Sequence, residues 1–406
     1  MKSVVAFVSL VLLGCAAIWA QNAGNRVGNR EKSASTQQKT GAAKTSVPPD
    51  PTIAAAVAKG ARWLASVQGA DGGWGQDGGN ASNVRQGVDL ESKENDVANT
   101  AIAALALLRA GDKYKPNVER AVDFILRRVE SSPAEGLSIT NVSDNKQTQV
   151  QRKLGPYIDT FVASMLLAQV DGTFAKAGNV RIRSGLEKCV AKIQRNQTKD
   201  GSWNTGGGWA PLLGTSLASR SLYEAGQKGV AVNQEVLARA DAYTVKNQKD
   251  RDSMARGRVG SGGGVAAGDG PGIGVVGGLT ETVSVTAAAG VALYQDAQAL
   301  EQLSRTPESR RENAKEIAAI NAKLSDSKFV DGFGSIGGEE FFSYLNIGDG
   351  LKRSGGKEWR EWNSKTTQRI LKLQNDDGTW AGHHCITGRC AVTSAAILNL
   401  TSDRVD

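Results

Sequence analysis

The chain has 406 residues, of which 40% are hydrophobic and 22% are charged, so it is long and apolar enough to bury a sizeable core. Its net charge of +8 is modest for this length. No Lys/Arg cluster interleaved with aromatic residues is present, which argues against a nucleic-acid partner. The 48 glycines predict frequent turns or close backbone approaches.

Residues 1–20 are predicted to be a signal peptide, because Lys2 precedes an apolar run, Val4–Leu13, that is too short to span a bilayer. Two processing routes fit this segment. Cleavage after Ala20 would release a soluble protein that begins at Gln21. Alternatively, the LLGC run that ends at Cys15 resembles a bacterial lipobox, and lipidated Cys15 would tether the protein to a membrane. Both routes predict an exported protein, periplasmic or extracellular.

Residues 21–50 are polar, rich in Gly, Ser, Thr and Lys, and free of apolar periodicity. Such a segment cannot bury enough surface to offset its chain entropy, so a disordered linker is expected. Residues 51–402 are predicted to form one domain. No segment of the sequence approaches the roughly 18 consecutive apolar residues that a transmembrane helix needs.

Internal repetition is the strongest signal in the remaining chain. A Q-x-x-D-G-x-W motif begins at Gln68, Gln197 and Gln374. The intervals between the copies fit two and three units of about 55–65 residues, so six units are expected. The missing copies are predicted, in degenerate form, at Glu135-Gly136, near Gln248 (with Met254 in the Trp position) and at Asp331-Gly332.

Each unit is predicted to be two helices joined by the motif. The first helix of each unit is charged with an apolar stripe, which is typical of a surface helix, and the second is poor in charge and rich in small residues, which is typical of a buried one. The first helices are expected at Ile53–Val67, Asn117–Val129, Arg181–Gln194, Asn233–Lys246, about Pro307–Leu324 and Lys357–Leu373. The second helices are expected at Val97–Ala110, Tyr157–Val170, Gly214–Ala225, Thr282–Gln298, Glu339–Arg353 and Ala391–Leu400. This pattern predicts an all-α (α/α)6 toroid or barrel of about six helical hairpins, and the alternative is an open solenoid.

The three motif copies resemble the QW repeats of squalene cyclases and related terpenoid cyclases. The run from Asn99 to Leu108 resembles the inner helices of that superfamily, which also contains the protein prenyltransferases. The resemblance covers about residues 52–402 and implies a structural role for the motif residues, although Trp could also serve as a platform for a sugar or an isoprenoid. The residues concerned are Gln68, Asp71, Trp74, Gln197, Asp200, Trp203, Gln374, Asp377 and Trp380.

The catalytic motifs of these relatives are absent from the sequence. The chain has no D-x-D-D acid, no D-D-x-x-D magnesium motif, no D-x-C zinc pair of the prenyltransferases, and no C-G-E-Q of the thioester toroids. We therefore expect neither the known cyclisation nor prenyl transfer, and no cofactor.

The segment from Gly382 to Cys390 contains both histidines of the chain. His383, His384, Cys385 and Cys390 are candidate zinc ligands by residue type, but their spacing matches no familiar zinc motif. A Cys385–Cys390 disulfide fits an oxidising compartment, and a free thiol with rim histidines is the third interpretation. Cys189 is expected to be a buried thiol.

Polar residues at the N-terminal ends of the inner helices are the candidate ligand-binding residues, because those ends converge on one mouth of a toroid. Most such residues act as helix caps. The candidates are Asp96, Asn99, Asp159, Thr215, Glu281, Glu339, Glu340 and, on the last rim loop, His384. The Gly-rich run Gly257–Gly278 is interpreted as a flap over this mouth.

We therefore expect an exported toroid that binds an apolar, isoprenoid-like small molecule or a peptide in its central cavity. The alternative is a secreted carbohydrate-active enzyme, because some polysaccharide lyases are α/α toroids and the GGWGQ run at Gly72–Gln76 resembles one of their motifs. An apolar cavity lining favours the first hypothesis. Arg and Lys with carboxylates in an open groove favour the second.

Overall fold

The computed structural model describes residues 50–77, 94–140, 147–155, 157–203, 211–260, 289–332, 337–383 and 385–404, which belong to one compact unit, Pro49–Asp406. The predicted signal peptide and linker lie outside these residues, apart from Asp50. Within the described residues the regular structure is helical and no strand forms. None of the helices described is long and apolar enough to cross a membrane.

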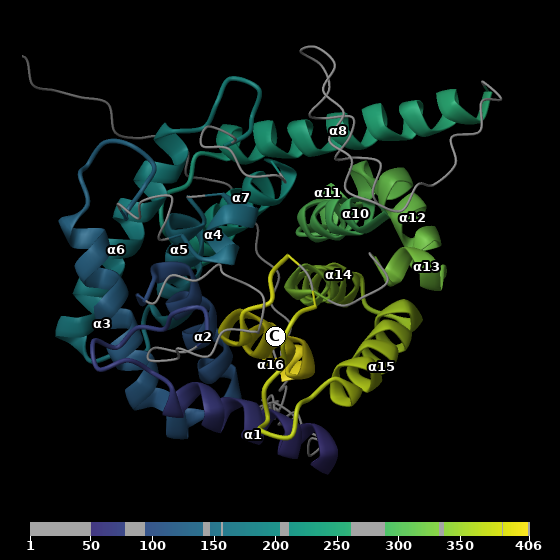
Figure 1. Cartoon of the computed structure of the whole chain (residues 1–406). Coiled ribbons are helices and arrows are strands. Elements are labelled where there is room, and N and C mark those ends of the chain that lie inside the picture. Colours follow the sequence, from purple (N-terminus) through teal and green to yellow (C-terminus); the bar gives the residue numbers. More distant parts are fainter. Residues whose placement is uncertain are drawn as a thin grey trace, which may run out of the picture. The chain divides into compact units, whose positions relative to one another are not determined.

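Six inner helices pack in a closed cycle, each against the next and the last against the first. In this order they are α2 (Val97–Ala110), α5 (Ile158–Val170), α7 (Pro211–Gln227), α10 (Ala289–Leu303), α14 (Gly338–Ser354) and α16 (Arg389–Leu400), and they can be followed in Figure 1. The contact of α16 with α2 closes the ring. The toroid prediction is therefore confirmed over the open solenoid.

The outer helices pack against neighbouring inner helices, as α6 does against α5 and α7. They are α1 (Pro51–Ser66), α3 (Lys115–Ser131), α6 (Lys176–Arg195), α8 (Gln234–Gly260), α11 (Pro307–Glu312) with α12 (Ala314–Lys323) and α13 (Ser327–Val330), and α15 (Lys357–Lys372). Amphipathic sequence decides this placement. Helix α3, for example, buries Val118, Val122, Ile125 and Val129 on one stripe.

The inner helices are buried on nearly all sides. Every residue of α16 from Cys390 to Leu400 is buried, and α5 is buried throughout except at Gln169. Small residues are frequent in several of these helices, above all in α2 and α16, so neighbouring backbones there can approach closely without leaving voids between them.

The three Q-x-x-D-G-x-W segments link consecutive outer helices in the same way. Each Trp indole N–H donates to a carbonyl of the preceding outer helix, and each Gln amide donates to a carbonyl of the next outer helix. The indole bonds are 2.6–2.8 Å long and join Trp74 to Leu64, Trp203 to Ile193 and Trp380 to Ile370. The amide bonds are 2.8–2.9 Å long and join Gln68 to Asn117, Gln197 to Val236 and Gln374 to Ala56. The third copy therefore ties α15 to α1 across the closure of the ring.

The Asp-Gly pair makes the turn inside each motif. Asp200 Oδ1 accepts from the Ser202 N–H at 3.0 Å, and Gly201 adopts a φ of +93°. A Cβ atom at Gly201 would collide with the Arg239 carbonyl of α8. Glycine is therefore required for both the backbone conformation and the close approach of the next outer helix.

The secondary structure differs from the prediction at two places, α8 and α4. Helix α8 continues through Gln248 and Met254 to Gly260, so the predicted degenerate turn is wrong. The segment lacks an Asp-Gly pair, and nothing else there interrupts the helix. The short helix α4 (Gln149–Leu154) was not predicted, because six residues carry too little periodicity to be recognised.

Candidate functional site

The inner helices surround a cavity of about 110 Å³. Each of them contributes to the wall, which is mostly aliphatic and aromatic. Examples in ring order are Ile102, Val162, Leu217, Tyr294, Phe342 and Leu398. Helix α14 shows how this arises, because Glu339, Phe342, Ser343 and Asn346 line the cavity and their i, i+3, i+4, i+7 spacing places them on one helix face.

The cavity is more exposed at the C-terminal ends of the inner helices than at their N-terminal ends. Leu108, in the last turn of α2, is 37% exposed, whereas Ile158 and Glu339 at helix starts are 0% and 3% exposed. The accessible end is therefore opposite the mouth that we expected. The reason is that the segment before α16 lies across the N-terminal ends, where the Gln149 side chain accepts from the Thr387 N–H at 2.7 Å.

A carboxyl group lies at the closed end of the cavity. Glu339, in the first turn of α14, accepts from the Ile386 N–H through Oε2 at 3.1 Å. Burial raises the pKa of Glu339, against the lowering effect of the hydrogen bonds from its own N–H, Ile386 and the Cys385 thiol. Beside it, the Tyr294 hydroxyl donates to Glu340 Oε1 at 2.8 Å.

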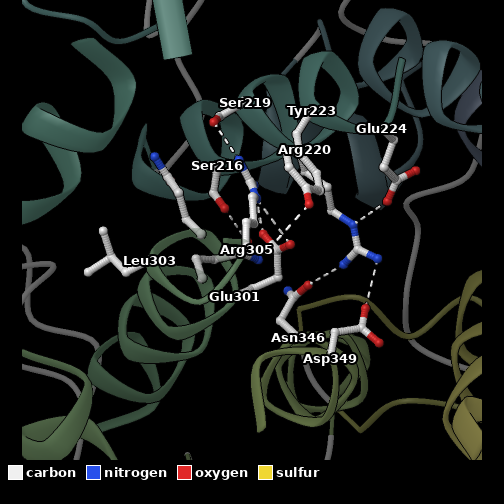
Figure 2. Close-up of polar contacts among 12 residues, drawn as sticks. Ser216, Ser219, Arg220, Tyr223, Glu224, Glu301, Leu303, Arg305, Asn346 and Asp349 are labelled. Atoms are coloured by element: carbon white, nitrogen blue, oxygen red, sulfur yellow. Dashed lines mark hydrogen bonds and ion pairs between the residues drawn. The ribbon is translucent and has the colours of Figure 1, made fainter. Parts of the chain in front are cut away.

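Arg220, at the accessible end, is paired with carboxylates (Figure 2), whereas Arg109 donates to the Leu398 carbonyl at 3.3 Å. Arg220 of α7 donates to Glu224 at 2.8 Å, to Asp349 at 2.7 Å and to Asn346 at 2.9 Å. Burial opposes its charge, yet the carboxylates of Asp349 and Glu224 raise the pKa of Arg220 well above its ordinary value. Arg220 is thus a buried cation that holds α7 to α14.

A second buried ion cluster continues away from the cavity (Figure 2). Glu301 accepts from Arg305 at 2.7 Å and from Arg353 at 2.8 Å. Burial opposes ionisation of Glu301, but Arg305, Arg353 and Arg220 together lower its pKa below the ordinary value. Arg305 also donates to Ser219 at 2.8 Å, which joins the turn after α10 to α7.

Comparison with known proteins gives the same relationship that the motifs indicated. The family model of the squalene–hopene cyclase C-terminal domain matches residues 41–136. A squalene–hopene cyclase from Bradyrhizobium diazoefficiens is 39% identical over 73 residues. The chain is terpenoid-cyclase-like. The aligned stretch spans 17% of this chain and only 10% of that cyclase.

Two solved structures of variants of a type II terpene cyclase from Scytonema, each in complex with geranylgeranyl dihydroxybenzoate, also resemble the terpenoid-cyclase-like toroid. The matches cover 87% and 86% of this chain and 97% of each cyclase chain. Sequence identity is 11% in both cases, and the TM-scores are 0.33 and 0.31.

Of the predicted rim residues of the terpenoid-cyclase-like toroid, some are buried in the wall, one lines the cavity, and others lie outside the described residues. Asp96 caps α2 by accepting from the Asn99 N–H at 2.9 Å, and Asp159 accepts from Thr140 at 2.6 Å. Both are buried in the wall rather than lining the cavity. Burial and then the charge of Asp159 raise the pKa of Asp96 to about 7. Glu339 lines the cavity, while Glu281 and His384 lie outside the described residues.

The candidate zinc ligands differ in their exposure to solvent. Cys390 is fully buried and His383 is exposed, and the described thiols of Cys189, Cys385 and Cys390 are free. The described residues contain no group of three His, Cys, Asp or Glu side chains able to hold a metal ion. His384 lies outside them, so the zinc hypothesis stays a prediction. Most of the Gly257–Gly278 run also lies outside them.

The polar residues of the accessible end were missed in the sequence. Arg109, Arg220 and Asn346 line the cavity, but Arg109 lies at the end of α2 and the other two lie near the middle of α7 and α14, whereas the predicted site used only the N-terminal ends. A usable signal was present, because an arginine within a helix that is otherwise poor in charge needs a buried partner or a cavity.

Proposed function

We propose that the toroid binds an apolar, isoprenoid-like small molecule in its central cavity. The observation that carries this proposal is the composition of the cavity wall, to which all six inner helices contribute aliphatic or aromatic side chains. Water in such a cavity makes few hydrogen bonds, and an apolar ligand gains about 25 cal/mol for each Å² of apolar surface that it buries.

The size of the cavity limits what enters it. A volume of about 110 Å³ is below the roughly 300–1,000 Å³ of pockets that enclose whole ligands. Only a short apolar chain fits in this conformation, and a longer chain extends toward the more exposed Leu105, Leu108 and Leu217. A peptide would have to insert a single apolar side chain.

Binding of geraniol, a ten-carbon isoprenoid alcohol, to the full chain tests the proposal by isothermal titration calorimetry. Leu217→Trp fills the cavity and is expected to weaken binding by more than about tenfold, which corresponds to 1.4 kcal/mol. Val180→Trp is the matched control, because Val180 is 66% exposed and away from the cavity wall. Equal weakening by both variants, or no binding at all, would refute the proposal.

The carbohydrate hypothesis predicts a different result, namely binding of an acidic oligosaccharide such as oligogalacturonate. The cavity arginine with the most contacts, Arg220, is engaged by Glu224, Asp349 and Asn346, which does not favour an acidic sugar. If the protein binds oligogalacturonate and does not bind geraniol, the carbohydrate hypothesis is favoured over the isoprenoid-like ligand.

Export is part of the same proposal and rests on residues 1–20 of the sequence alone. N-terminal sequencing of the mature protein distinguishes the routes, because soluble release begins at Gln21 and lipidation blocks Cys15. A mature protein that still begins at Met1 would rule out both routes.

A further inference from the structure

The first turn of α14 places one carboxyl against the closed end of the central cavity. The Gly338 N–H donates to the Ile386 carbonyl at 2.8 Å, and the Ile386 N–H donates to Glu339 Oε2 at 3.1 Å. A Cβ atom at Gly338 would lie 2.6 Å from Ile386 Cγ2. Glycine at position 338 therefore allows the loop before α16 to approach and to hold the Glu339 carboxyl.

The other oxygen of this carboxyl is unsatisfied. Glu339 is 3% exposed, and among the described residues Glu339 Oε1 has no hydrogen-bond partner. Buried polar atoms nearly always have a partner, so an orphan that lines a cavity marks a contact completed by something else. The Cys385 thiol interacts with this carboxyl but makes no hydrogen bond to Oε1, so water or a ligand in the cavity is the remaining source of that contact.

The surroundings of Glu339 favour its neutral form. The titratable groups that face it within the described structure are Glu340 of the same helix, Tyr294 of α10 and Cys385 of the loop, and none of these is a cation. Tyr294 is committed to Glu340, to which its hydroxyl donates at 2.8 Å. Burial raises the pKa of Glu339 accordingly.

The hydrogen bonds also decide which oxygen carries the proton. Oε2 already accepts from the Ile386 N–H, so the proton of a neutral Glu339 belongs on Oε1. Glu339 then presents a donor O–H, and the matching group is an acceptor oxygen. An anionic ligand group would be repelled by Glu340 close by, and a pure hydrocarbon would leave the donor unsatisfied.

We propose that Glu339 donates a hydrogen bond to the oxygen of a neutral oxygenated ligand, a hydroxyl or carbonyl group at the end of an isoprenoid-like chain, at the closed end of the central cavity. This inference rests on the proposed function. The oxygen lies deepest, and the chain extends past Phe342 and Leu217 toward the accessible end. Glu339 thus selects oxygenated over hydrocarbon ligands.

The test compares geraniol with its deoxygenated counterpart, 2,6-dimethyl-2,6-octadiene, on the full chain by competition binding. Wild type is expected to prefer geraniol by about 2- to 12-fold, the range of one net hydrogen bond. Glu339→Met should abolish the preference and still bind the hydrocarbon. Glu339→Gln keeps an N–H donor and should retain the preference, and so should the matched control Glu235→Met, at an exposed position of the outer helix α8 away from the cavity.

A second measurement does not depend on the Met variant. Infrared spectroscopy of wild type should show a protonated-carboxyl C=O band that shifts when geraniol is added, does not shift with the hydrocarbon, and is lost in Glu339→Gln. A wild type without this ligand-sensitive band overturns the inference.

The outcomes separate the two proposals. If both probes bind wild type equally, or if Glu339→Met keeps the preference for geraniol, the inference is wrong and the proposed function stands. If neither probe binds wild type, both the proposed function and the role of Glu339 are wrong.

Discussion

The indole of Trp203 joins an outer helix to the turn that follows it. The ring is 3% exposed, and its N–H donates to the Ile193 carbonyl at 2.6 Å. Trp203→Ala is expected to cost about 3–5 kcal/mol in the free energy of unfolding, as for other buried aromatic truncations. Trp203→Phe keeps most of the ring and removes only the donor, so it should cost less. Urea denaturation measures both, and an unchanged midpoint for Trp203→Ala would refute the structural role.

The Asp96 carboxyl is expected to make the free energy of unfolding depend on pH. Because burial and Asp159 raise the pKa of Asp96 to about 7 in the folded state, the folded state holds its proton up to that pH, whereas the unfolded chain releases it near 4. Stability should therefore fall as pH rises from about 4 to 7, on the order of several kcal/mol. Asp96→Asn should flatten this fall, which urea denaturation at several pH values would detect.

The substitution Asp96→Asn is expected to preserve the start of α2, because Asn is also a good helix cap. Asn99 Nδ2 donates to Asp96 Oδ2 at 2.8 Å, so the Asn99 amide has to turn over, and its unpartnered Oδ1 then accepts from the new amide. A fall of the same steepness in both proteins would show that Asp96 does not carry the proton.

Between elements, a buried ion pair joins α7 to α14 through Arg220. Arg220→Met leaves Glu224 and Asp349, which are 15% and 14% exposed, without their cation. Breaking a buried pair by removing one partner costs about 3–5 kcal/mol. The control is Arg127→Met, whose partner Asp123 is 45% exposed, and which should cost less than about 1 kcal/mol. Similar losses in the two variants, measured by thermal unfolding, would contradict this account.

The type and order of the elements followed from periodicity. Helix α2 spans Val97–Ala110 as predicted, and α3, α5, α14 and α16 begin and end within a few residues of the predicted positions. The fourth outer helix was predicted to end at Lys246 and extends to Gly260. The predicted turn failed because this segment has no Asp-Gly pair, and a six-fold repeat does not require a turn in every copy.

For the whole molecule, closure of the ring makes the first and last hairpins interdependent. Helix α16 packs on α2, α14 and α1, and the Cys390 N–H donates to the Gln76 carbonyl at 3.0 Å. Deletion of residues 389–406 would expose the inner faces of α2 and α14. We expect loss of cooperative unfolding in the truncated chain, measured by circular dichroism during thermal denaturation. Five hairpins that still unfold in one sharp transition would instead indicate solenoid behaviour.

The candidate site was predicted less well than the fold. The central cavity and its apolar character followed from inner helices that are apolar on every face. Which end is accessible did not follow, because that depends on the loop before α16 and on its bond between Gln149 and Thr387. Glu339 and Glu340 are adjacent in sequence and alike in type, yet only Glu339 lines the cavity.

The sequence by itself determined the six-fold helical repeat, the division into outer and inner helices, and the turns at the Asp-Gly pairs. These depend on local propensity and on hydrophobic period, which act within a few residues. Only the tertiary structure decided that Glu339 Oε1 is left unpartnered, that Arg220 is neutralised by Asp349, and which end of the cavity is accessible. Those outcomes depend on which residues distant in sequence meet, and burial then fixes their charge and hydrogen bonding.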